Sequence, residues 1–216
     1  MTSLEDHVTA MPPVVSAEEW QRQRDALLVV EKEATRRLDA IAAQRRRLPM
    51  VRFDNDRYVF ETAQGPKRLA DFFEGQPQLA VYQFMDRGPD EFCPGCTFFT
   101  MNVTALQTLA KNGVAWRTVS NMPLSQMTSY WATRGFTVPY ASSHGTSFSA
   151  DCGADDGFML SMFFTDGDDV YRTYSTTARG ADRLLFANNI LDLAAYGRQE
   201  EWEDSPPGWP QFPTYG

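Results

Sequence analysis

Hydrophobic residues recur at helical spacing near the amino terminus of the chain. After Pro12-Pro13, which stops regular structure, Ser16 and Glu19 have the spacing of a capping box that starts a helix. We expect this helix to run to about Arg47 and to end at Leu48-Pro49. Spacings of seven, four and three residues give it one apolar face, made of Trp20, Leu27, Ala34, Leu38, Ile41 and Leu48.

The opposite face of this helix carries Glu, Arg and Lys side chains. At its carboxyl end, Arg45-Arg46-Arg47 complements the negative end of the helix dipole, with a partner-docking patch as the alternative interpretation. A long helix with one apolar stripe needs a surface to lie on, either its own domain or a second subunit. We expect it to be a docking element that supports a homodimer.

From Val51 onward the hydrophobic pattern changes to that of a chain with strands. Val51–Phe53 and Tyr58–Phe60 flank Asp54-Asn55-Asp56 and predict a small hairpin, and Gln78–Met85 predicts a strand buried on both faces. The remaining predicted elements are a helical turn at Leu69–Phe73, helices at Cys96–Asn112, Pro123–Thr133 and Ala181–Leu193, and strands at Val114–Ser120, Phe158–Thr165 and Val170–Thr176.

The order of these elements predicts an α/β fold. A strand, a crossover helix and a second strand imply a parallel pair, and the turn Asp166-Gly167-Asp168-Asp169 adds an antiparallel hairpin. We therefore expect a mixed sheet flanked by helices. The predicted organisation is a flexible lead over residues 1–15, the long helix over 16–48, the α/β domain over 49–196 and an irregular Pro- and Trp-rich tail over 197–216.

Composition and charge exclude several classes of protein. Hydrophobic residues make up 43% and charged residues 22% of the 216 residues, which is ordinary for a globular chain. The net charge of −8 disfavours nucleic acid and anionic membrane surfaces as partners. No apolar run approaches the roughly 18 residues of a membrane span, and the amino terminus lacks the apolar segment of a secretory signal. We expect a cytoplasmic protein with reduced thiols.

The most informative motif is Phe92-Cys93-Pro94-Gly95-Cys96, which follows the predicted buried strand and opens a helix. The amino terminus of a helix stabilises a thiolate through its oriented amides and its dipole. Cys93, at the exposed end of the loop, is therefore the predicted attacking thiolate. Cys96, deeper in the helix, is the predicted resolving thiol, and the two sulfurs would act through a mixed disulfide.

Other interpretations of these cysteines remain open. A four-ligand zinc site would need a second cysteine pair or paired histidines, which the chain lacks. Copper or another soft metal could use Cys93, Cys96 and His144. The pair could also be inert in a non-catalytic binding module of the same α/β fold. We expect Cys152 to be a small buried residue, with a third redox partner as the alternative. No glycine-rich phosphate loop is present, so no cofactor is expected.

The residues around the motif resemble a known bacterial family. LPMVRFDNDRYVFETAQGPKRLADFFEGQPQLAVYQFMDRGPDEFCPGC, which starts at Leu48, is similar to the thioredoxin-like family catalogued as domain of unknown function 899. The later segments VYRTYSTTARG and ILDLAAYGRQEE resemble the same family, so the likeness covers roughly residues 16–200. The resemblance implies a thioredoxin-like fold and a dithiol-disulfide oxidoreductase in which Cys93 and Cys96 form the redox pair. A disulfide- or thiol-containing substrate follows from that activity.

Two features differ from thioredoxin itself. The spacer Pro94-Gly95 reverses the Gly-Pro order of thioredoxin, and no proline stands near Leu160-Ser161-Met162, where thioredoxins place a cis-proline.

The loop before the motif is acidic. We expect Asp86, Asp90 and Glu91 to raise the pKa of the Cys93 thiol against the effect of the helix dipole, with an offset by Arg87 as the alternative. The expected result is a modestly stabilised thiolate and a reduction potential nearer thioredoxin, at about −270 mV, than the oxidising periplasmic enzymes.

Overall fold

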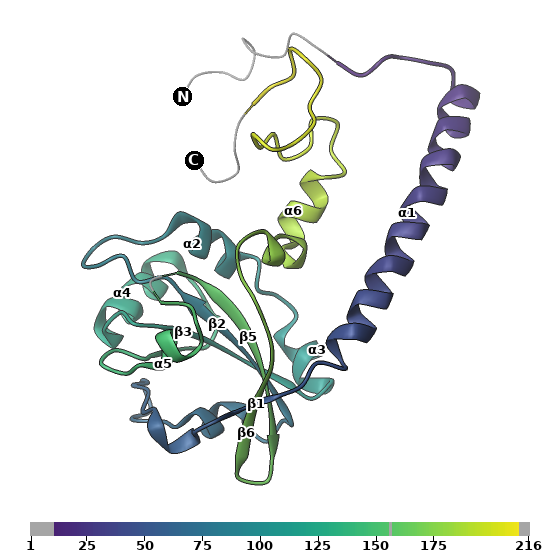
Figure 1. The fold of residues 1–216 in the computed structure, drawn as a ribbon. Helices are drawn as coiled ribbons and strands as arrows, with labels where there is room; N and C mark the ends of the chain where they lie inside the picture. Colours follow the sequence, from purple (N-terminus) through teal and green to yellow (C-terminus); the bar gives the residue numbers. More distant parts are fainter. Residues whose placement is uncertain (1–10, 156, 212–216) are drawn as a thin grey trace. The chain divides into compact units, whose positions relative to one another are not determined.

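The computed structural model describes residues 11–155 and 157–211 (Figure 1). Most of the predicted lead over residues 1–15 and the tail residues Phe212 and Tyr215 lie outside the described residues. The chain divides into two compact units. One contains the residues through Leu48 together with those from Ile190 onward, and the other spans Pro49–Asn189.

The long amino-terminal helix is α1 (Ala17–Arg45), close to its predicted bounds. The Ser16 hydroxyl accepts a hydrogen bond from the Glu19 backbone N–H at 3.2 Å, which confirms Ser16 as the N-cap. The Glu19 carboxylate accepts from the side chains of Arg22 and Gln23. No residue of α1 is buried.

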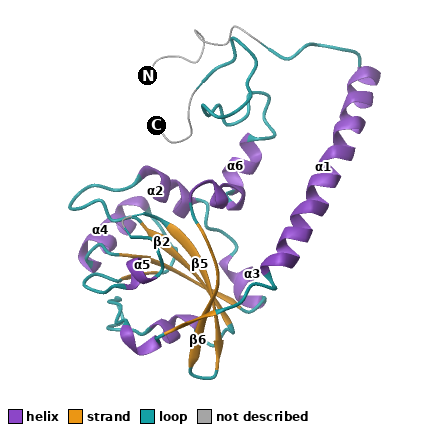
Figure 2. Cartoon of the chain, viewed as in Figure 1, coloured by secondary structure: helices purple, strands orange, loops and turns teal. Residues whose placement is uncertain are grey.

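The unit from Pro49 to Asn189 is built on a mixed sheet (Figure 2). Within the described residues this sheet has six strands in the order β1-β6-β5-β2-β3-β4. β2, β3 and β4 are parallel, whereas β5 is antiparallel to β2, β6 to β5 and β1 to β6. The strands are β1 (Val51–Phe53), β2 (Gln78–Phe84), β3 (Val114–Ser120), β4 (Tyr140–Ser142), β5 (Met159–Asp166) and β6 (Asp169–Thr176).

Helices cover both faces of this sheet. On one face, α2 (Pro94–Met101) and α4 (Leu124–Arg134) bury Cys96, Phe99, Met127 and Trp131 against Ala80, Tyr82 and Phe84 of β2. On the other face, the 3₁₀ helix η3 (Leu69–Phe73) and α5 (Phe148–Asp151) bury Phe72, Phe73 and Phe148 against Leu79 and Val81. The predicted thioredoxin-like α/β fold, with helices on both faces of a mixed sheet, is confirmed. The central strand β2 is buried on both faces, as the sequence predicts.

The predicted hairpin over residues 51–60 is wrong. β1 instead pairs with β6, with Phe53 opposite Val170, and residues Asn55–Arg57 form the 3₁₀ helix η2. The Asp54 side chain accepts a hydrogen bond from the Asp56 N–H at 3.0 Å. This local bond favours a helical turn over the tight turn of a hairpin, and β1 becomes an edge strand of the sheet.

The prediction of a single helix over Cys96–Asn112 is also wrong, because the helical structure is interrupted between α2 and α3 (Leu106–Lys111). The Asn102 amide donates to the Phe98 carbonyl at 2.8 Å, and its oxygen accepts from the Ala187 N–H at 2.8 Å. Ala105 then adopts a φ of 56°, in the left-handed region. Asn102 thus ends α2 and ties it to a distant segment.

The last predicted helix, Ala181–Leu193, is divided in the same way. It consists of the 3₁₀ helix η4 (Ala178–Leu184) and the short helix α6 (Phe186–Leu191). The hairpin of β5 and β6 is confirmed, with Asp166 paired to Asp169. Strand β4 and helix α5 were not predicted.

The tail after α6 is irregular but carries its own contacts. The rings of Tyr196 and Trp209 meet edge to face at a centroid distance of 5.1 Å. The Arg198 guanidinium bonds the carboxylates of Asp192 at 2.7 Å and Glu203 at 3.4 Å. These contacts give the described part of the tail a local structure without regular elements.

Candidate active site

Cys93 is the N-cap residue of α2, so the helix begins at Pro94 and not at Cys96 as predicted. The Cys93 sulfur accepts a hydrogen bond from the Cys96 backbone N–H at 3.3 Å. Pro94 takes the first helical position, where a backbone N–H has no helical partner. The sulfur therefore lies at the positive end of the α2 dipole.

The loop before Cys93 is held together by contacts between its own residues. Asp86 and Phe92 form an isolated antiparallel bridge, and the Asp86 carboxylate accepts from the Gly88 N–H at 2.9 Å. Arg87 pairs with Glu91 at 2.6 Å. The Gln126 side chain of α4 donates to the Gly88 carbonyl at 2.9 Å and ties the loop to that helix.

This closed loop leaves Cys93 only 8% exposed, so the expectation of an exposed nucleophile is wrong. The Phe92 ring stacks on Tyr130 of α4 at 3.6 Å between centroids, which holds the chain beside Cys93 against the helix. The Tyr130 hydroxyl lies 2.6 Å from that of Thr97, which donates to the Cys93 carbonyl at 2.9 Å. These contacts hold the backbone of Cys93 between α2 and α4.

The surroundings of Cys93 favour its thiolate. The hydrogen bond from the Cys96 thiol is the largest influence, and the N–H groups of Cys96 and Gly95 and the charge of Arg87 act in the same direction. Burial opposes them. The hydrogen bonds and the charge of Arg87 outweigh burial, and the pKa of Cys93 falls to about 6. A thiol with this pKa is mostly ionised at neutral pH.

Cys96 has the opposite character. It is fully buried, and its hydrogen bond to Cys93, together with that burial, raises its pKa far above the ordinary value. The Tyr82 hydroxyl and the Met85 N–H, at 3.4 Å, both donate to the Cys96 sulfur and partly oppose this effect. At neutral pH the pair therefore combines one thiolate with one neutral thiol.

The acidic loop does not act on Cys93 as the sequence suggested. Glu91 is neutralised by Arg87, and the Asp86 carboxylate is engaged by a backbone N–H. Arg87 itself lowers the pKa of Cys93. The pKa of Cys93 is thus lowered, against the raising effect expected from Asp86, Asp90 and Glu91.

Tyr82 is the functional residue that sequence reasoning missed. It lies on β2, is 1% exposed and stacks on Phe99 of α2 with a centroid distance of 4.0 Å and an angle of 3°. Phe99 follows Cys96 by about one helical turn, so the stack fixes the Tyr82 ring beside the Cys96 sulfur. The alternation of β2 could have placed Tyr82 on the face of Ala80 and Phe84, but not in contact with a sulfur atom.

His144 does not join the cysteine pair. It is exposed in the loop after β4, and its Nδ1 atom lies 2.9 Å from the Asn121 carbonyl oxygen. Across residues 11–155 and 157–211 there is no group of three His, Cys, Asp or Glu side chains placed to hold a metal ion. The copper-binding set of Cys93, Cys96 and His144 is therefore not assembled here.

Cys152 lies in the core cluster on the other face of the sheet from Cys93 and Cys96. It is 2% exposed, and burial raises its pKa to about 12 against the opposing effect of Arg172. It is a small buried residue, as predicted, and it does not share the environment of the redox pair.

A small polar cavity of about 170 Å³ opens at the edge of the sheet where β2 and β3 end. Asp86 and Gly88 of the loop that leads to Cys93 line one side, and Asn121 and Ser149 line the other. Asn121 is held by the hydroxyls of Ser143, at 2.8 Å, and Ser149, at 3.2 Å. The cavity thus shares a loop with the cysteine pair.

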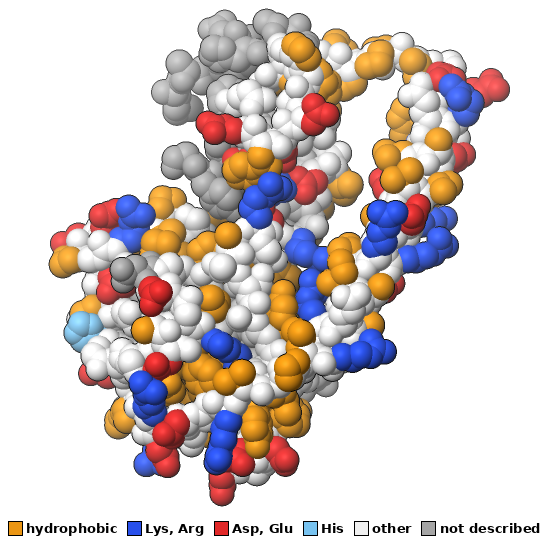
Figure 3. Space-filling model, in the orientation of Figure 1, with side chains coloured by type: hydrophobic (Ala, Val, Ile, Leu, Met, Phe, Trp, Pro, Cys, Tyr) orange, Lys and Arg blue, Asp and Glu red, His pale blue; other side chains and the backbone are white. Residues whose placement is uncertain are grey.

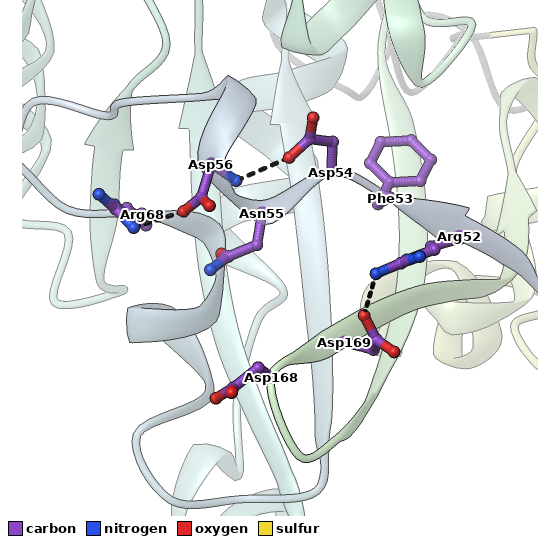
Figure 4. Close-up of a pocket in the computed structure, with 8 residues that line it drawn as sticks. All are labelled: Arg52, Phe53, Asp54, Asn55, Asp56, Arg68, Asp168 and Asp169. Carbon is purple, nitrogen blue, oxygen red and sulfur yellow. Dashed lines mark hydrogen bonds and ion pairs between the residues drawn. The ribbon is translucent and has the colours of Figure 1, made fainter.

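A larger cavity of about 740 Å³ lies at the β1 edge, away from the loop and helix that carry the cysteines (Figure 4). Arg52 and Arg68 reach across it to Asp169 and Asp56, respectively, as the dashed lines in Figure 4 show. These ion pairs already balance much of its charge. We assign no function to this cavity.

The structure thus belongs to the class of proteins that combine a thioredoxin-like fold with a cysteine pair at the start of a helix. The chain is a member of the family described as bacterial protein of unknown function, DUF899, whose model matches residues 9–214. No curated protein matches the chain. No described helix combines the length and apolar character that crossing a membrane requires.

Several solved structures are similar to this one. A hypothetical protein from Sinorhizobium meliloti matches with a TM-score of 0.41 and 18% identity over 66% of this chain and 79% of its own. A mutant of PrxQ from Xylella fastidiosa matches with a TM-score of 0.41 and 18% identity, over 66% of this chain and 94% of its own. The third is a secreted disulfide oxidoreductase from Mycobacterium tuberculosis, described as homologous to Escherichia coli DsbE. It matches with a TM-score of 0.38 and 16% identity, over 59% of this chain and 91% of its own.

Proposed function

We propose that this protein is a cytoplasmic thiol–disulfide oxidoreductase that acts on a disulfide- or thiol-containing substrate through Cys93 and Cys96. The observation that carries the proposal is the placement of two sulfurs three residues apart: Cys93 caps α2 and accepts from the Cys96 N–H, and Cys96 is buried behind it. The pKa of Cys93 falls to about 6 at the start of α2, while the pKa of the buried Cys96 is raised. Such a pair supplies a nucleophile and a resolving thiol from one motif.

In the reductive direction, the Cys93 thiolate attacks one sulfur of a substrate disulfide. A Cys93–substrate disulfide forms, the substrate S–S bond breaks, and the first substrate thiolate leaves. Cys96 then attacks the Cys93 sulfur as its proton passes to the substrate thiolate already released. This forms the Cys93–Cys96 disulfide and releases the second thiolate. The substrate gains two electrons and the protein loses two, which an external dithiol must restore. The same steps reversed oxidise a dithiol.

The second step is the more demanding one, because the neutral, buried Cys96 must become a thiolate. The Tyr82 hydroxyl and the Met85 N–H donate to this sulfur and stabilise its charge as the proton leaves. Tyr82 therefore acts as a hydrogen-bond donor to a reacting atom. Its stack on Phe99 keeps the hydroxyl in place during the reaction.

The roles of the two cysteines are tested by trapping the intermediate. With a small aromatic disulfide as substrate, Cys96→Ser should accumulate a stable mixed disulfide on Cys93, and Cys93→Ser should not. Cys152→Ser is the matched control, since Cys152 lies on the other face of the sheet, and it should exchange like the native protein. Selective alkylation of Cys96 at neutral pH in the reduced native protein would show that the roles are reversed.

The same substitutions address the rival functions. A non-catalytic binding module keeps its ligand affinity when both cysteines are replaced by serine, whereas an oxidoreductase loses all exchange. A copper site made with His144 loses metal when His144→Ala is introduced, whereas thiol–disulfide exchange continues unchanged.

A further inference from the structure

The apolar stripe of α1 is not buried within the unit that contains this helix. A helix of 29 residues is about 44 Å long. Its stripe side chains are well exposed, at 57% for Trp20, 53% for Leu27, 61% for Val30 and 41% for Ile41. Figure 3 shows hydrophobic side chains interspersed with charged ones on the visible face of this helix. Several large apolar side chains exposed along one helix indicate a site of association.

The spacing of the stripe is that of a helix made to pair with another helix. Trp20, Leu27, Ala34 and Ile41 follow one another at intervals of seven residues, and Val30 and Leu38 lie beside them on the same side. In helices that wind around each other, the positions three residues further on are apolar as well. Here these positions are Gln23, Val30 and Arg37, so the apolar seam of α1 is narrow. The exposed Val29 lies on the opposite side of α1 and does not belong to the seam.

The charges of α1 are divided unequally between its two halves. Residues 17–31 contain four acidic and two basic side chains, for a net charge of −2. Residues 32–45 contain four basic and two acidic side chains, for a net charge of +2. A parallel pair of α1 helices would place like charges side by side in both halves. An antiparallel pair places the acidic half of each helix against the basic half of the other, and it also opposes the two helix dipoles.

We infer that two copies of this chain pair through their α1 helices in antiparallel orientation. The two-fold axis passes close to Val30 and Glu31, the middle of the helix. This register sets Trp20 against the partner's Ile41 and Leu27 against the partner's Ala34, so that the larger side chain of each pair meets a smaller one. The occupant of the apolar stripe is therefore the same stripe of a second molecule. The inference is independent of the proposed redox function.

The association is tested on the full chain by light scattering coupled to gel filtration. The native protein should have the mass of a dimer at micromolar concentration. Leu27→Asp with Ile41→Asp places two charges in the seam and should give a monomer of unchanged fold by circular dichroism. Val29→Asp is the matched control, because it adds the same charge on the opposite face of α1, and it should remain dimeric. A monomeric native protein, or a dimer that withstands the seam substitutions, overturns the inference.

The orientation is tested by reversing charge in one half. Arg37→Glu with Arg45→Glu changes residues 32–45 from net +2 to net −2, so an antiparallel dimer then meets like charges along its full length. We expect its dissociation constant to rise at least tenfold in low salt, and the difference from the native protein to shrink in high salt. A parallel dimer exchanges one like-charge contact for another and keeps its affinity. An unchanged dissociation constant therefore overturns the antiparallel arrangement.

Discussion

Two sulfur atoms three residues apart have opposite acidities because the fold gives them different donors. Cys93 receives hydrogen bonds at the start of α2 and lies near the charge of Arg87, whereas Cys96 lies behind it in the core. Side chains more than ten residues away in sequence complete the site. Tyr82 from β2 contacts the sulfur of Cys96, and Tyr130 from α4 supports the backbone of Cys93 through Thr97.

The ionisation of Cys93 sets the pH dependence of its reactivity. Because its pKa is lowered to about 6, the thiolate predominates above that pH and is lost as the pH falls through it. Alkylation of the reduced protein by iodoacetamide should follow a single ionisation near pH 6. The ultraviolet absorbance of the thiolate, followed on the same sample, should change at the same pH. A midpoint at pH 8 or above, where an ordinary thiol ionises, would contradict the site geometry.

Replacing Tyr82 should separate the two steps of exchange. Tyr82→Phe keeps the ring stacked on Phe99 but removes the donor to Cys96, so closure of the Cys93–Cys96 disulfide should slow about tenfold, as expected for the loss of a hydrogen bond worth about 1.5 kcal/mol to a charged group. Attack by Cys93 on the substrate should keep its rate. Stopped-flow measurement of both thiol releases distinguishes the steps.

Tyr130→Phe is the matched control for that experiment, because the Tyr130 hydroxyl bonds Thr97 and not a sulfur. It should leave the second step unchanged. Equal slowing of both steps by Tyr82→Phe would indicate a structural role only.

At the scale of elements, the short-range patterns predict best. The strand β2 and the hairpin of β5 and β6 follow from local hydrophobic runs and the turn at Asp166-Gly167. The break between α2 and α3 does not, because Asn102 takes its second partner from Ala187, 85 residues away. The same holds for β1, whose pairing partner β6 is more than a hundred residues distant.

The Asn102 side chain is therefore expected to contribute to stability without affecting chemistry. Asn102→Ala removes its bonds to the Phe98 carbonyl and the Ala187 N–H, and should lower the free energy of unfolding by about 1–3 kcal/mol. Urea denaturation measures this change. Asn112→Ala is the matched control, since the Asn112 side chain makes one exposed bond to the Thr108 carbonyl, and its effect should be less than half as large. Equal effects would show that the link to Ala187 contributes nothing.

At the scale of the whole molecule, the sequence identified the fold class and the cysteine pair but not the electrostatic balance around it. The motif and its position between a buried strand and a helix are local features, so they could be predicted. The loop charges could be counted but not paired. Only the folded loop shows that Arg87 neutralises Glu91 and stabilises the Cys93 thiolate. Likewise, Cys93 follows a surface loop in sequence yet is 8% exposed in the folded chain, beside the stacked rings of Phe92 and Tyr130.

The reduction potential of the whole protein follows from this balance. Stabilising the thiolate stabilises the reduced form, and each unit of pKa corresponds to about 1.4 kcal/mol, or about 30 mV for a two-electron couple. Thioredoxin combines a thiol pKa of about 7 with a potential of about −270 mV. Because the pKa of Cys93 is lowered, we expect a potential between that of thioredoxin and that of the oxidising periplasmic enzymes, at about −120 mV. Equilibration with glutathione buffers measures it.

The sign of the Arg87 effect provides the sharper test. Arg87→Gln removes a cation that stabilises the Cys93 thiolate and leaves the Glu91 carboxylate unpaired nearby. The pKa of Cys93 should therefore rise, the reduced form should lose stability, and the potential should become more negative. Arg52→Gln, at the β1 edge, removes the same charge without reaching the loop and should leave the potential unchanged. If Arg87→Gln leaves the potential unchanged, the charge of Arg87 does not act on Cys93, and the hydrogen bonds at the start of α2 alone set the balance.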